Sequence, residues 1–216
     1  MYITAFATWR LKNGCKATVG RFNGMWWEVV GYPDVTNGEA DYINLIVYNG
    51  TPYISFKDYY YGGRASVGKF NGTYWEYVGM SGFSSGVAND VSMFIENGNI
   101  YVAYTDWARN GKATVMKYSS SGQWQPVGVP GFSGDAAYYT AIYVKNGTPY
   151  VGYRDYLQAS VMTYDGSSWK YVGDRRFTPG GVGFNSLIMV GDTPYMAFTN
   201  CYYYDCVSVV KYDEEK

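Results

Sequence analysis

Short stretches of alternating apolar and polar residues, each bounded by a tight turn, recur along the whole chain. Residues 51–56 alternate in this way, which is typical of a β-strand with one face buried. The preceding dipeptide Asn49-Gly50 tolerates the positive backbone φ angles of a two-residue hairpin turn. Residues 44–48, before the turn, are again largely apolar. The pattern therefore predicts a β-hairpin over residues 44–56.

The chain then continues into a second hairpin. A polar and aromatic loop at residues 57–63 leads to a strand at 64–70, and Asn71-Gly72 turns the chain into a strand at 74–78. A longer link, residues 79–89, carries the chain to the next hairpin. Four short antiparallel strands followed by one long link are the anatomy of a β-propeller blade.

This unit repeats. The motif Trp-x-x-Val-Gly occurs four times, with its tryptophans 48, 49 and 45 residues apart, and Thr-Pro-Tyr-like and Ala-Thr-Val-like motifs share the period. A constant period of this length indicates a repeat architecture. We therefore predict an all-β fold: one β-propeller domain over residues 1–216, with four-stranded antiparallel blades and about 4.5 repeats. The repeats cover residues 1–42, 43–90, 91–139, 140–185 and 186–216, the last of them incomplete.

The ends of the repeat leave ring closure open. The chain begins with the second strand of a unit and ends after the third, which gives 18 strands. Residues 186–190 could pair with the three N-terminal strands, completing four blades and leaving a surplus hairpin. Alternatively, five blades form, two of them three-stranded. In a third arrangement the surplus hairpin or an open strand edge pairs with another chain, which would allow a homo-oligomer.

Most of the repeated residues have a structural explanation. We expect the four tryptophans and the valine three residues after each to pack between adjacent sheets. Each link contains one aromatic residue that we expect to anchor it on the core: Tyr32, Phe83, Phe132 and Phe177.

Composition excludes several functions. The net charge is −1, so no basic surface for nucleic acid is expected. The sequence has no histidine, which removes Ser–His–Asp and Cys–His catalysis and the commonest zinc ligation. No apolar run is long enough to span a membrane, and the N-terminal residues do not resemble a signal peptide. We expect no cofactor and no metal. With only three cysteines, a disulfide between Cys201 and Cys206 and two free thiols are both open.

Two resemblances arise at this point. Residues 69–79, residues 82–84 and the stretch Thr148 to Asp155 resemble a repeat of large secreted or cell-surface bacterial proteins, which are usually regarded as β-propellers without an assigned activity. That resemblance implies a secreted or cell-surface location. The unit length and strand plan are similar to those of five-bladed tachylectin-type lectins, which implies sugar sites between blades, although the motif residues differ.

An enzymatic reading is weaker. Residues 165–169 partly resemble the Asp box of sialidases, but the residue between Asp and Gly is missing. No arginine triad is identifiable, and carboxylates recur singly rather than as close pairs. We therefore expect that the protein is not an enzyme.

The loop between the second and third strands carries the candidate binding residues. It opens with an aspartate in three units, and an aromatic residue follows in most units. A carboxylate beside an exposed ring suits a sugar, whose hydroxyl groups need acceptors while its C–H face stacks on the ring. The competing reading is that each aspartate bonds its own turn and each ring covers the blade end. The candidates are Trp9, Asp58, Tyr59, Asp106, Trp107, Asp155, Tyr156 and Tyr202.

The sequence thus favours a non-catalytic, lectin-like module that binds glycans through these loops. The alternative is a protein-interaction or structural module of a larger surface protein. The partner is accordingly a glycan or a protein surface, with no nucleic acid and no membrane insertion. The tracts Tyr59-Tyr60-Tyr61 and Tyr202-Tyr203-Tyr204 should each expose at least one ring, since three consecutive rings on a short loop cannot all be buried.

Overall fold

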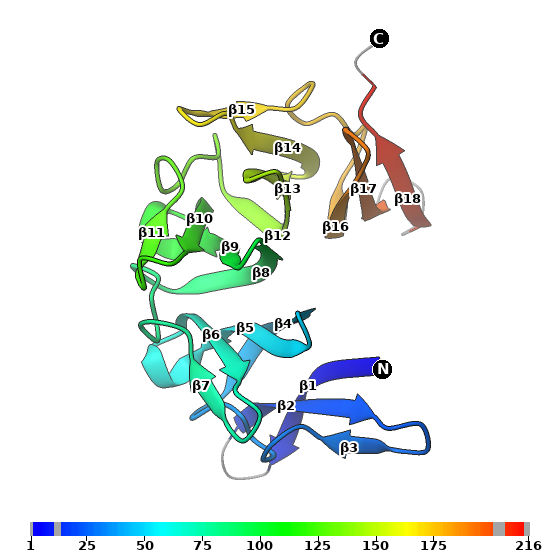
Figure 1. Cartoon of the computed structure of the whole chain (residues 1–216). Coiled ribbons are helices and arrows are strands. Elements are labelled where there is room, and N and C mark those ends of the chain that lie inside the picture. Colours follow the sequence, from blue (N-terminus) through cyan, green and yellow to red (C-terminus); the bar gives the residue numbers. More distant parts are fainter. Residues whose placement is uncertain (1, 11–13, 201–205, 214–216) are drawn as a thin grey trace.

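The computed structural model describes residues 2–10, 14–200 and 206–213. Within them, eighteen strands form five antiparallel sheets, called blades 1 to 5 (Figure 1). No helix among these residues is both long enough and apolar enough to cross a membrane. Blade 1 contains β1 (Tyr2–Arg10), β2 (Gly14–Phe22) and β3 (Trp27–Val29). Blade 2 contains β4 (Ala40–Tyr48), β5 (Thr51–Asp58), β6 (Arg64–Phe70) and β7 (Trp75–Tyr77).

The remaining blades repeat this order. Blade 3 contains β8 (Ala88–Glu96), β9 (Asn99–Asp106), β10 (Lys112–Tyr118) and β11 (Trp124–Pro126). Blade 4 contains β12 (Ala137–Lys145), β13 (Thr148–Asp155), β14 (Gln158–Tyr164) and β15 (Trp169–Tyr171). Blade 5 contains β16 (Val182–Val190), β17 (Thr193–Asn200) and β18 (Cys206–Lys211). Single turns of 3-10 helix, η1 (Tyr59–Tyr61) and η2 (Trp107–Arg109), follow β5 and β9.

The blades stand side by side along an arc, with blades 1 and 5 at its two ends (Figure 1). In each complete blade the first strand lies nearest the centre of the arc and the fourth lies at the rim. The all-β propeller prediction is confirmed, and so is the arrangement of five blades with two three-stranded ends. Pairing of residues 186–190 with the N-terminal strands is wrong, because β16 pairs with β17, for example Leu187 with Met196.

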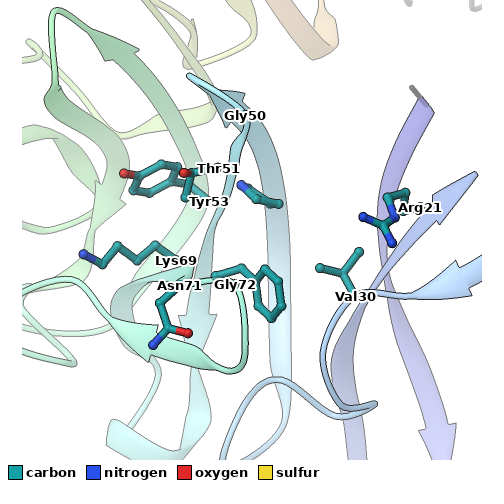
Figure 2. A pocket seen from close by; sticks show the side chains of 10 residues that line it. Arg21, Val30, Gly50, Thr51, Tyr53, Lys69, Asn71 and Gly72 are labelled. Atoms are coloured by element: carbon teal, nitrogen blue, oxygen red, sulfur yellow. The ribbon is translucent and has the colours of Figure 1, made fainter.

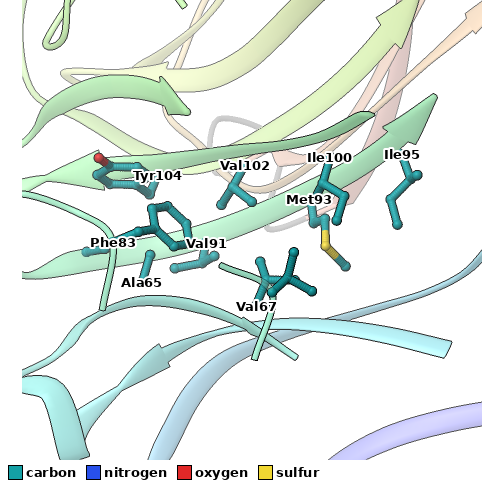
Figure 3. Close-up of a cluster of buried hydrophobic side chains, with 11 residues drawn as sticks. Ala65, Val67, Phe83, Val91, Met93, Ile95, Ile100, Val102 and Tyr104 are labelled. Carbon is teal, nitrogen blue, oxygen red and sulfur yellow. The ribbon is translucent and has the colours of Figure 1, made fainter. Parts of the chain in front are cut away.

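Apolar side chains fill the spaces between neighbouring blades. Figure 3 shows the cluster between blades 2 and 3, in which Val67 of β6 faces Val91 and Met93 of β8. Equivalent clusters lie between blades 1 and 2, 3 and 4, and 4 and 5. Because residues on a strand alternate between its two faces, each inner sheet contributes one face to each of two clusters. The core is therefore a series of layers, and no blade buries its apolar faces alone.

The repeated tryptophans secure these layers. Trp124 is half-buried, and its ring stacks on Phe83 of the link from blade 2 to blade 3, with centroids 3.9 Å apart. Trp27 is an exception, because 54% of its surface is exposed. The link residue Tyr32 is also 75% exposed, so the expectation that it anchors the link is wrong.

Candidate functional site

A β-bulge interrupts the first strand of blades 2 to 5, at the same place in each. Two residues of the first strand there oppose one residue of the second strand. The first bulge residue is not glycine, yet its φ lies between +49° and +54° in all four blades. Positive φ is unusual for such residues, and bulges of this kind re-aim a side chain. The four residues are Tyr42, Asp90, Tyr139 and Phe184, which we call the bulge row.

Side chains connect neighbouring bulges. The hydroxyl group of Thr140 donates a hydrogen bond to the carbonyl oxygen of Asp90 in the preceding blade. In the same way, Nδ2 of Asn185 donates to the carbonyl oxygen of Tyr139, at 3.1 Å. The rings of Tyr139 and Phe184 lie 5.0 Å apart between centroids. A bulge removes carbonyl groups from the regular ladder, and these contacts supply donors to two of them, those of Asp90 and Tyr139. The bulge row is therefore a connected feature near the centre of the arc.

The end of the row at blade 2 combines a carboxylate, a lysine and two rings. The hydroxyl group of Tyr59 donates to Oδ2 of Asp41 at 2.8 Å, and this bond raises the pKa of Tyr59 to about 12. Lys57 lies over the rings of Tyr59 and Tyr42, with Nζ 4.7 Å and 5.9 Å from their centroids. Partial burial and then the charges of Asp90 and Asp41 raise the pKa of Tyr42. The two carboxylates on adjacent blades thus both act on Tyr42.

Asp90 shares a hydroxyl group with a backbone carbonyl. Oγ1 of Thr105 lies 3.0 Å from Oδ2 of Asp90 and 2.5 Å from the carbonyl oxygen of Ala137. Thr105 is buried and has one hydroxyl proton for these two acceptors. The Thr105 hydroxyl group can therefore donate either to Asp90 or to the carbonyl oxygen of Ala137, but not to both at once.

Polar atoms without partners lie beside the row. Nε of Arg154, Oδ1 of Asn44 and Oδ1 of Asn185 are buried and form no hydrogen bond. The guanidinium group of Arg154 lies over the rings of Tyr138 and Tyr139, 4.9 Å and 4.8 Å from their centroids. Buried polar atoms normally have a partner. These three atoms give the surroundings of the row unused hydrogen-bonding capacity.

The predicted aspartates lie at the same end of the blades as the row, because each pairs with the first residue of the inner strand, as Asp58 does with Ala40. All three are completely buried. Asp58 accepts hydrogen bonds from the backbone of Tyr60 and the hydroxyl group of Tyr77, at 3.1 and 3.0 Å. Asp106 accepts an intrablade hydrogen bond from Thr114, and Asp155 accepts one from Ser160 of its own blade and another from Arg175 of the link that follows. The three carboxylates already have partners in their own blade or in the adjoining link, and their contact with a ligand stays a prediction.

The predicted aromatic residues that follow these buried aspartates are exposed at the surface. Tyr59, Trp107 and Tyr156 expose 42%, 47% and 68% of their surface. They remain on separate blades, and only Tyr59 has a described bond to a residue adjoining the row. Trp9 lies in β1 opposite Cys15, but its side chain is outside the described part. Tyr202, the second tyrosine tract and the Cys201–Cys206 pair fall in residues that the structure does not describe, apart from Cys206.

Blade 4 departs from the others in its charges. Arg175 and Arg176 both bond Asp135 and Asp155, with Nε of Arg175 2.6 Å from Oδ2 of Asp155. Burial opposes ionisation of Asp155, but the hydrogen bonds from the two guanidinium groups lower its pKa overall. Arg176 also lies over the ring of Tyr156, 5.7 Å from its centroid. This cluster ties the link after β15 to the end of β13.

Two cavities lie away from the row. Figure 2 shows one of about 480 Å³, in which Arg21 and Val30 come from blade 1 and the other lining residues from blade 2. It borders the turn at Gly50, at the opposite end of β4 from Tyr42. The other cavity, of about 660 Å³, lies between blades 4 and 5. The described residues bring together no group of three or more acidic or cysteine side chains suited to a metal ion.

The sequence matches no protein-family model and no curated protein. Solved structures share the fold. A Bacteroides ovatus protein described as xyloglucan PUL GH43B is 12% identical, with a TM-score of 0.52, over 96% of this chain and 49% of that one. A Trypanosoma rangeli sialidase is 13% identical, with a TM-score of 0.53, over 97% and 37%. The Aleuria aurantia lectin AAL is 16% identical, with a TM-score of 0.55, over 91% and 67%. The chain thus spans about half and about a third of the first two proteins.

These comparisons correct two expectations. The predictions of a non-catalytic lectin-like or interaction module, and of a protein that is not an enzyme, are wrong, because glycoside hydrolases recur among the structures that share the fold. The sequence argument relied on the incomplete Asp box, on the lack of an identifiable arginine triad and on carboxylates that recur singly. At 11–16% identity the likeness itself establishes the fold alone.

Proposed function

We propose that this chain is a carbohydrate-active β-propeller that hydrolyses glycosidic bonds at the bulge row. The observation that carries the proposal is the row itself: four successive blades turn a non-glycine residue out of the innermost strand at one end of the sheets. Bulges occur frequently beside active sites. The row offers rings on which a sugar can stack. It also offers two carboxylates, since Asp90 belongs to the row and Asp41 precedes Tyr42 in β4.

Asp90 and Asp41 are the candidates for the chemistry. Glycoside hydrolysis generally uses two carboxyl groups, one to protonate the leaving oxygen and one to activate water or form a covalent intermediate. The hydroxyl group of Thr105 holds the carboxyl group of Asp90 in place, with Oγ1 3.0 Å from Oδ2. Asp90 then donates its proton to the leaving oxygen as the C–O bond breaks. Asp41, held by Tyr59, takes the proton of the attacking water.

The remaining groups suit substrate binding. Tyr139 and Phe184 form a pair of neighbouring rings, of which Phe184 is 76% exposed. The exposed rings of Tyr59, Trp107 and Tyr156 could extend the aromatic surface outward, and their contact with a sugar stays a prediction. A secreted or cell-surface location, where polysaccharides are encountered, stays a prediction.

Sugar release from aryl glycosides and from xylan, arabinan and galactan tests the proposal. We expect Asp90→Asn to lower the rate by at least about 100-fold, the usual contribution of a general acid. Asparagine tolerates the left-handed backbone at this position, so the fold should be unchanged. Asp192→Asn is the matched control, because that side chain is fully exposed in the turn between β16 and β17. A wild-type protein that cleaves none of a broad substrate panel would refute catalysis, and unchanged activity of Asp90→Asn would refute the site.

A further inference from the structure

The junctions between complete blades contain a repeated tryptophan slot. At the junctions of blades 2 and 3 and of blades 3 and 4, the tryptophan of the later blade stacks on the phenylalanine of the link. Trp124 lies on Phe83 with centroids 3.9 Å apart, and Trp169 lies on Phe132 at 3.8 Å. Each tryptophan also contacts an aromatic ring on the third strand of its own blade, as Trp124 contacts Tyr118 at 5.3 Å.

A hydrogen bond fixes the depth of the indole in the slot. Nε1 of Trp124 donates to the carbonyl oxygen of Val78 at 3.0 Å, and Trp169 donates to Val127 at 2.9 Å. Trp75 makes the same bond across the junction of blades 1 and 2. The valine is in each case that of the Trp-x-x-Val-Gly motif in the preceding blade. Three groups therefore line each slot. They are the valine carbonyl group of the earlier blade, the aromatic residue of the link and the aromatic residue on the third strand of the later blade.

All three groups are present between blades 4 and 5, where the described residues supply no tryptophan. Phe177 is the link ring, Val172 carries the carbonyl group and Tyr212 follows the third strand, β18. They line the cavity of about 660 Å³, together with Gly173 and Met196 among others. Gly173 and Tyr212 have the same spacing as the equivalent pair at an occupied junction. A Cβ added to Gly173 would lie 2.7 Å from Cε2 of Tyr212. At the occupied junction of blades 3 and 4, the Cβ of Gly128 would lie 2.7 Å from Cε2 of Tyr164.

Beside the cavity, β18 also has an edge to which a further strand could pair. Among the described strands, β18 pairs only with β17. Lys211 pairs with Tyr195 as Lys69 pairs with Tyr53 in blade 2. Nζ of Lys69 forms an ion pair of 3.1 Å with Glu76, the residue after Trp75. A strand carrying Trp-Glu would therefore place its glutamate beside Lys211.

We propose that this cavity is an acceptor site for a β-strand of the Trp-Glu-x-Val-Gly type, contributed by another polypeptide. The strand adds antiparallel to β18, stacks its indole on Phe177, donates the indole N–H group to the carbonyl oxygen of Val172 and pairs its glutamate with Lys211. Strand addition of this kind takes its affinity from backbone hydrogen bonds and its specificity from a side-chain pocket. The site is distinct from the bulge row and requires no catalytic activity.

A peptide with the sequence of residues 71–79, which contains Trp75 and Glu76, tests the proposal. Fluorescence anisotropy of the labelled peptide should show saturable one-to-one binding to the full chain. The Trp75→Ala peptide should bind at least tenfold more weakly, and this comparison leaves the protein unaltered. Lys211→Glu should weaken the original peptide and restore binding of a Glu76→Lys peptide. Tyr32→Ala is the control protein, since this exposed link ring lies outside the cavity lining.

Several results would overturn the proposal. The peptide could fail to bind, or the Trp75→Ala peptide could bind equally well. Free indole competing as strongly as the whole peptide would make the cavity a small-molecule site. Self-association in light scattering that Trp27→Ala abolishes would assign the cavity to a second copy of this chain.

Discussion

The hydroxyl group of Tyr59 donates a 2.8 Å hydrogen bond to Oδ2 of Asp41. Tyr59 begins the turn after the second strand of blade 2, and Asp41 lies next to the bulge residue of the first strand. The bond therefore joins the loop that the sequence singles out to the bulge row, whose one signal in the sequence is its spacing. It also keeps a carboxylate in a fixed orientation next to Tyr42.

Replacing Asp41 with Asn should lower the pKa of Tyr59 from about 12 toward its ordinary value near ~10. The folded pKa is raised, so the contribution of this bond to stability is complete below ~10 and is lost as the pH rises through the folded value. Ultraviolet titration of wild type, Asp41→Asn and Tyr59→Phe isolates the signal of this residue. Identical titration curves for wild type and Asp41→Asn would contradict the assignment.

Trp124→Ala should destabilise the fold by about 3 kcal/mol, because it opens a space between blades 2 and 3 and removes the partner of the Val78 carbonyl group. Trp27→Ala is the matched control in the same motif. That ring is largely exposed, so its loss should cost less than about 1 kcal/mol. Urea denaturation gives both values. Equal losses for the two variants would show that the tryptophans do not act through the blade junctions.

Asp155→Asn should lower the free energy of unfolding by about 2–3 kcal/mol, since it leaves two guanidinium groups without their buried partner. The folded pKa of Asp155 is lowered. Its contribution is therefore present above the unfolded value near ~4 and is lost as the pH falls through the folded value. Denaturation at pH values from neutral to strongly acidic should show the two proteins converging at the acid end. A constant difference at all pH values would exclude this carboxylate as the titrating group.

Asp106→Ala should cost about 2 kcal/mol, because the buried carboxylate caps the turn η2 through the backbone of Ala108 and accepts from Thr114. Thermal unfolding measures the change, with Asp192→Ala as the exposed control. An Asp106→Ala protein of unchanged stability that had lost sugar release would instead place this residue at the substrate.

The fold could be predicted from the sequence because the blades repeat the same strands and turns, and four of them carry the same tryptophan motif. The tryptophan period and the turn dipeptides fix the strand order, and positive φ at both Asn49 and Gly50 confirms the turn chemistry. Closure could not be predicted in the same way. A count of 18 strands allowed residues 186–190 to pair either with the N-terminal strands or with the strand that follows them. The observed pairing of Leu187 with Met196 decides for the second arrangement.

The candidate site was the harder inference. The bulge residues Tyr42, Asp90, Tyr139 and Phe184 share no residue type, and none is a glycine that would mark a left-handed position. Their one signal is spacing, since they follow the same intervals of 48, 49 and 45 residues as the tryptophans. The predicted aspartates, by contrast, repeat conspicuously because each satisfies its own turn, as Asp58 does with Tyr60.

The most direct test is a crystal structure of the Asp90→Asn protein soaked with an oligosaccharide that the wild type cleaves. The account predicts a sugar ring stacked on Tyr139 or Phe184, with its glycosidic oxygen within hydrogen-bond distance of residue 90. An oligosaccharide bound only in the cavity beside Gly50, or on the loops around Trp107 and Tyr156 away from the row, would contradict it.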